Sequence, residues 1–135
     1  MTPFPGFDIM GPAEIDKNGG INMLTLDALR EYGANVKEGL GRCMNNEAFY
    51  LRMVGIAVKD TKIAALDAAV REKDFKSAFE LAHGLKGMYA NLSLTPLSVP
   101  LSEITELLRA GADTDYSVLM NEIILQKQKL DELAA

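Results

Sequence analysis

Residues 75–92 read FKSAFELAHGLKGMYANL, and the spacing of their apolar side chains decides the fold. Apolar residues recur at steps of three and four, which is the repeat of an α-helix with one buried face. Asp74, which precedes the stretch, is of a residue type that caps helices. The sequence therefore predicts a helix from residue 75 to about 92, and its apolar face consists of Phe75, Ala78, Phe79, Ala82, Leu85, Tyr89 and Leu92.

The segments on both sides also read as helices. Thr25, Asn35 and Asn46 are caps that can open three of them. Pro100 leaves two possibilities for the helix near it: an irregular first turn, or a true start near Ser98. The expected helices are residues 26–32, 36 to about 44, 47–58, one opened by Asp60 or Thr61, 95–109, and one from Asp115 or Tyr116 to the C-terminus.

Val, Ile and Thr never alternate with polar residues over the length of a strand, so no sheet is expected. The longer helices have short connections, which favours an all-α fold: an antiparallel up-and-down four-helix bundle with short extra N-terminal helices. Residues 1–20 hold three prolines and four glycines and read as a flexible N-terminal lead-in. The bundle domain is expected to cover residues 21–135.

Composition excludes several classes of function. The 135 residues amount to about one domain, and the net charge of −5 argues against a nucleic-acid partner. His83 and Cys43 are the only histidine and cysteine, too few for a zinc site, and we expect no metal and no cofactor. No apolar run reaches the roughly 20 residues of a membrane span, and Met1–Met10 lacks the basic residues of a signal peptide. We expect a cytoplasmic monomer without a membrane partner.

His83 does not fall on the apolar face of its predicted helix. It projects about 140° from the centre of that face, toward solvent, together with Lys76, Gly87 and Ala90. Glycine inside a helix costs about 1 kcal/mol relative to alanine, so Gly84 and Gly87 need a reason. Clearance for a partner surface is the favoured reason for Gly87. Clearance and close packing of a neighbouring helix are equally open for Gly84.

A neutral imidazole is a good nucleophile near neutral pH, and its attack on a phosphoryl group gives a transferable phosphoramidate. Lys86, three residues after His83, is placed to bring an ammonium group near the phosphoryl oxygens. The same ammonium would favour the neutral imidazole by like-charge repulsion. No Walker-type motif is present, so the phosphoryl group must come from another protein and pass to another.

At these residues the sequence resembles the histidine-containing phosphotransfer (HPt) domain family. The pattern Ala-His-x-Leu-Lys-Gly stands at residues 82–87, and an Asn-Leu-Gly-like turn follows at the helix end. The resemblance covers roughly residues 45–132. Two departures are Ser93, where the family usually has a glycine that ends the helix, and Val99–Pro100, in a region that is ordinarily regular helix.

The resemblance implies a four-helix bundle with His83 as the exposed phosphoacceptor. It assigns support of the phosphoryl group and of partner approach to Lys86 and Gly87. We expect a phosphocarrier of a two-component phosphorelay, not an enzyme, with receiver domains of response regulators and hybrid sensor kinases as partners. Lys76, Gly84, Gly87 and Ala90 are the expected partner-binding residues. Two alternatives are a non-catalytic interaction module of the same fold and an excised phosphotransfer domain of a histidine kinase.

Overall fold

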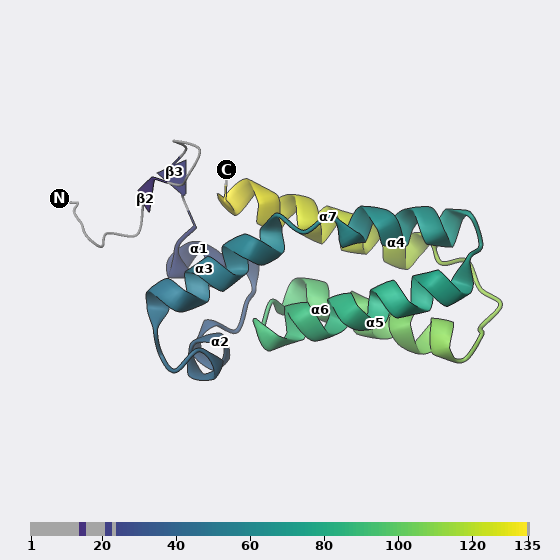
Figure 1. Cartoon of the computed structure of the whole chain (residues 1–135), viewed down its shortest axis with the longest axis horizontal. Coiled ribbons are helices and arrows are strands. Elements are labelled where there is room, and N and C mark those ends of the chain that lie inside the picture. The colour runs from purple at the N-terminus through teal and green to yellow at the C-terminus, as the bar shows by residue number, and fades with distance from the viewer. Residues whose placement is uncertain (1–13, 16–20, 23, 135) are drawn as a thin grey trace.

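The computed structural model describes residues 14–15, 21–22 and 24–134 (Figure 1). It contains seven helices and one pair of short strands in this described part. The helices are α1 (Leu26–Tyr32), α2 (Val36–Arg42), α3 (Glu47–Val58), α4 (Lys62–Arg71), α5 (Phe75–Asn91), α6 (Thr95–Arg109) and α7 (Ser117–Ala134).

The caps read from the sequence open their helices as predicted. Thr25, Asn35 and Asn46 each accept a hydrogen bond from the backbone N–H three residues on. Asp74 does the same for Ser77 at the start of α5. Such caps satisfy N–H groups that have no partner inside the helix, so these helix starts are fixed locally.

The longer helices form the predicted antiparallel bundle. α5 packs between α4 and α6, and α7 closes the bundle against α6, α4 and α3 (Figure 1). α3 and α4 lie one after the other along the same side of the bundle, and both contact α7. The core between them is aliphatic, with Tyr50 and Tyr89 as its largest fully buried side chains.

The two short N-terminal helices sit at one end of the bundle. α1 lies against α7, and α2 lies at the C-terminal end of α5 (Figure 1). Cys43, which follows α2, is a buried free thiol. None of the described helices is long and apolar enough to cross a membrane.

Three local expectations need correction or comment. α6 begins at Thr95 and continues through Pro100, so the helix has neither an irregular first turn nor a start near Ser98. Phe75 is 43% exposed, because it lies in the first turn of α5, where its ring packs on Tyr116 at the edge of the core. Strands β2 (Glu14–Ile15) and β3 (Ile21–Asn22) form an antiparallel pair too short to show any alternation in the sequence. Apart from Glu14–Ile15, the predicted lead-in at residues 1–20 lies outside the described residues.

Candidate functional site

His83 stands on the outer side of α5, near the middle of the helix, and is exposed. The residues before and after it on the inner face, Ala82 and Leu85, are buried in the core. α5 is therefore fixed by its buried face, and the orientation of His83 follows from its register on the helix. Within residues 24–134 the imidazole makes no hydrogen bond and no ion pair.

The ring of His83 is nonetheless held in place by an aromatic neighbour. Phe79, one turn earlier, stacks on it with 5.8 Å between ring centroids and 16° between ring planes. A stacked ring covers one face of the imidazole. The nitrogen lone pair lies in the ring plane, so stacking on a ring face does not cover the edge that would attack a phosphorus atom, and the residue as a whole is exposed.

The two glycines beside His83 border open space. A Cβ atom built on Gly84 or on Gly87 would meet no atom within 4 Å. The packing explanation for Gly84 is therefore wrong, because no neighbouring helix approaches it. Clearance on the outer face is the explanation that remains for both glycines.

Lys86, one turn after His83 on α5, forms a cluster of charges with two side chains of α6. The ammonium of Lys86 lies 3.9 Å from one carboxylate oxygen of Glu106. The guanidinium of Arg109 lies 3.3 Å from the other oxygen and also 5.1 Å above the ring of Phe79. The sequence prediction included Lys86 but missed Glu106 and Arg109. Folding residues 95–109 back on residues 75–92 brings the two helices together, but the sequence does not give the register that places these two side chains beside Lys86.

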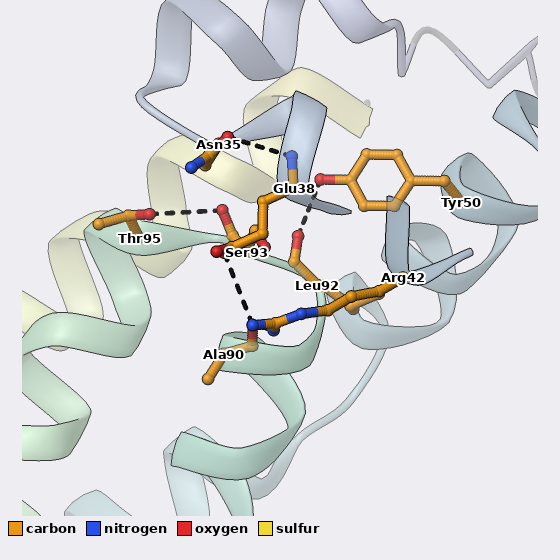
Figure 2. A network of polar contacts seen from close by, with 8 residues as sticks. All are labelled: Asn35, Glu38, Arg42, Tyr50, Ala90, Leu92, Ser93 and Thr95. Carbon is orange, nitrogen blue, oxygen red and sulfur yellow. Dashed lines mark hydrogen bonds and ion pairs between the residues drawn. The ribbon is translucent and has the colours of Figure 1, made fainter. Parts of the chain in front are cut away.

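The other two predicted partner-binding residues are at the ends of the same face. Lys76 is exposed and has no ion pair in the described part of the chain. Ala90 is half-buried, and its carbonyl accepts a hydrogen bond from the guanidinium of Arg42 on α2 (Figure 2). The outer face of α5 is thus exposed to solvent from Lys76 to Gly87, and α2 contacts it at Ala90.

The end of α5 has the left-handed turn that a glycine would normally form. Ser93 has φ 56° and is buried. Its N–H donates to the carbonyl of Ala90, and the N–H of Leu94 donates to that of Tyr89, each at 3.0 Å. These are the two hydrogen bonds of a Schellman motif. The substitution of serine for glycine therefore leaves the expected turn intact.

A polar network from α2 supports this turn (Figure 2). The hydroxyl of Ser93 donates to Glu38 at 2.7 Å, and its carbonyl accepts from the N–H of Asn35 at 2.9 Å. Glu38 also lies 3.7 Å from Arg42. Tyr50 donates to the carbonyl of Leu92 at 2.8 Å. The helix that carries His83 is thereby tied at its end to the N-terminal helices.

Burial determines the acid–base behaviour of the tyrosines that anchor α5. Burial raises the pKa of the Tyr50 phenol to about 12, because the phenolate form cannot be solvated there. Burial also raises the pKa of Tyr89, whose hydroxyl donates to the carbonyl of Ala57 at 3.1 Å. Both phenols are therefore neutral hydrogen-bond donors over the physiological range.

The described residues contain no group of three or more His, Cys, Asp or Glu side chains that could hold a metal ion. The arrangement offers instead an exposed imidazole, the ammonium of Lys86 one turn along the helix, the guanidinium of Arg109 beyond the Phe79 ring, and a helix face without large side chains at Gly84 and Gly87. This combination can accept and release a small anionic group whose charge the cations balance.

Comparison with known proteins gives one match. Residues 60–135, more than half of the chain, match the sequence model of a family described as Hpt domain. The match covers α4 to α7 and includes His83, Lys86, Glu106 and Arg109. Comparisons with curated proteins and with solved structures found no match.

Proposed function

Because the chain belongs to the Hpt domain family, we propose that His83 is its phosphoacceptor in a phosphorelay. Histidine phosphotransfer in a phosphorelay is the role that this family implies. The observation that carries the proposal is the exposure of the one imidazole of the chain on an open helix face. The proposed partners are receiver domains of response regulators and of hybrid sensor kinases, and the proposed location is the cytoplasm.

The proposed transfer is a direct displacement at phosphorus. The neutral ring nitrogen attacks the acyl phosphate of a receiver aspartate, the phosphorus–oxygen bond breaks, and the aspartate leaves as a carboxylate. The ring proton is then released to solvent. The reverse step on a second receiver restores the imidazole, so the protein is a carrier that returns to its starting state. This is why we describe it as a phosphotransfer intermediate and not as a kinase.

The open space beyond Gly84 and Gly87 supports this proposal. In-line displacement requires the attacking nitrogen, the phosphorus and the leaving oxygen to lie roughly on one line. The aspartate is part of a receiver surface, so that surface must approach α5 closely. Side chains larger than hydrogen at these two positions would project toward it. Lys86 supports the proposal in a second way, since its ammonium can balance charge on the transferring group.

Transfer from phosphorylated receiver domains tests the proposal. Receiver domains of the same genome are loaded with labelled acetyl phosphate and mixed with the wild-type chain or with the His83→Gln variant. We expect label on the wild type that survives alkali but not acid, and no label on the variant. Because the chain has one histidine, acid-labile label assigns the residue without mapping. Label that persists in His83→Gln would refute the proposal, and absence of any transfer would favour an interaction module of the same fold.

A further inference from the structure

We propose that Glu106 is a counter-ion that competes with the phosphoryl group for Lys86 and Arg109, and so lowers the stability of the phosphorylated state. This inference rests on the proposed role of His83. It assigns Glu106 a positioning role, since its carboxylate acts through the two cations rather than on the reacting atoms. The effect would keep the carrier able to release its phosphoryl group.

The contacts of Glu106 carry the inference. Its carboxylate lies 3.9 Å from the ammonium of Lys86 and 3.3 Å from the guanidinium of Arg109. Within the described residues, neither cation has another ion-pair partner. In the unphosphorylated state, the two positive charges on this face therefore share one negative charge.

Both cations are linked to His83 through α5, Lys86 by its spacing on the helix and Arg109 through the ring of Phe79. Lys86 follows His83 by three residues on the same helix, so the two side chains are neighbours on its surface. Arg109 lies over the ring of Phe79, and that ring stacks on His83. A single phenyl ring thus separates the guanidinium from the imidazole, and the flexible Arg109 side chain must move past this ring to contact a phosphoryl group on His83.

Phosphorylation would change the charge balance at this place. The phosphoryl group adds about two negative charges and three acceptor oxygens. To bind it, Lys86 and Arg109 must leave or share Glu106. The carboxylate also repels the new dianion directly. Glu106 therefore disfavours the phosphorylated state by competition and by repulsion, and the two contributions can be separated by mutation.

Phosphoramidate is a suitable probe because it phosphorylates histidine without a protein partner. Its phosphorus–nitrogen bond breaks as a bond forms between phosphorus and the His83 ring nitrogen, and ammonia leaves and takes up the ring proton. The fraction of phosphorylated chain is measured by intact mass at a fixed ratio of phosphoramidate to ammonium. We expect Glu106→Gln to raise the equilibrium constant about threefold to tenfold, the range of two exposed charge pairs. The gain should shrink at high salt.

Glu103→Gln is the matched control. Glu103 is exposed on α6, one turn before Glu106, and has no ion-pair partner in the described part of the chain. The variant removes the same charge and should leave the equilibrium constant at the wild-type value. If Glu106→Gln behaves like this control, or lowers the constant, the inference is wrong.

A mutant cycle separates competition from direct repulsion. Competition predicts that Glu106→Gln loses most of its effect when Lys86 and Arg109 are both replaced by methionine. An undiminished effect in that background would overturn the competitive role. Failure of the proposed function looks different, because phosphorylated receiver domains would then transfer no label to His83 although phosphoramidate still phosphorylates it.

Discussion

Replacing Ser93 tests how the end of the His83 helix is held. Ser93 adopts a left-handed backbone with φ 56°, which costs an L-residue roughly 1–2 kcal/mol. Its hydroxyl donates to the carboxylate of Glu38 at 2.7 Å. Hydrogen bonds to charged groups contribute about 1.5–3 kcal/mol, and the 51% exposure of the Glu38 side chain points to the lower end. The hydrogen bond therefore offsets the backbone cost.

Alanine and glycine at this position separate the two contributions. Ser93→Ala keeps the left-handed backbone and loses the hydrogen bond, so we expect a loss of about 1.5 kcal/mol in the free energy of unfolding. Ser93→Gly loses the same bond but relieves the backbone, and glycine adds about 0.4–1 kcal/mol of unfolded-state entropy. The glycine variant should therefore be more stable than the alanine variant by about 1 kcal/mol.

Urea denaturation followed by circular dichroism measures these differences. Ser102→Ala is the control, since Ser102 is half-buried on α6 and its hydroxyl makes no hydrogen bond within residues 24–134. A double-mutant cycle of Ser93→Ala with Glu38→Ala should give a coupling of about 1.5 kcal/mol. An alanine variant as stable as wild type, or a coupling near zero, would refute the role of this hydrogen bond.

Three further outcomes are expected. Gly39→Ala should lower the free energy of unfolding by about 1–3 kcal/mol, because a Cβ atom at this position would lie 2.5 Å from the Tyr50 ring. Gly41 borders open space, so Gly41→Ala should not lower it. Urea denaturation measures both variants. Gly87→Ala should stabilise the helix by up to about 1 kcal/mol and leave labelling by phosphoramidate unchanged, but slow transfer from a receiver domain, as a stopped-time labelling assay would show. The pKa of Tyr50 is raised from 10.0 to about 12 in the folded state, so its contribution to stability is complete below pH 10 and is lost as pH rises toward 12; Tyr50→Phe should flatten this fall in denaturation curves taken across that range.

The helices were predictable because their signals are local. The caps Thr25, Asn46 and Asp74 each act on a backbone N–H three residues away, which a sequence displays directly. The apolar repeat of residues 75–92 likewise fixes which side of α5 is buried. Phe75 lies on the predicted side of α5 but is only partly covered, because periodicity does not show how far the first turn of a helix extends beyond the core.

The surroundings of His83 were only partly predictable. Lys86 lies on the same helix, so its distance from His83 follows from spacing alone. Glu106 and Arg109 reach the site only because α6 packs against α5, and sequence periodicity contains no information about the register of that packing. The stack of Phe79 on His83 was missed for a different reason. Phe79 was read as a core residue, whereas it lies at the edge of the apolar face, where one side of its ring is available.

The serine at the end of α5 and the N-terminal helices are best understood together. The family match begins at residue 60, yet Ser93 is held by Glu38 and Asn35, which precede that point. Similar contacts cross the same boundary at α3: its last carbonyls, on Ala57 and Val58, accept hydrogen bonds from Tyr89 and from Lys127. A glycine would adopt the left-handed turn without help from any other helix. A serine there needs a partner for its hydroxyl, and α2 supplies one. The departure from the family pattern at Ser93 is therefore tolerable because this chain has α2, and loss of α2 would leave the end of the His83 helix with a backbone cost and no offsetting hydrogen bond.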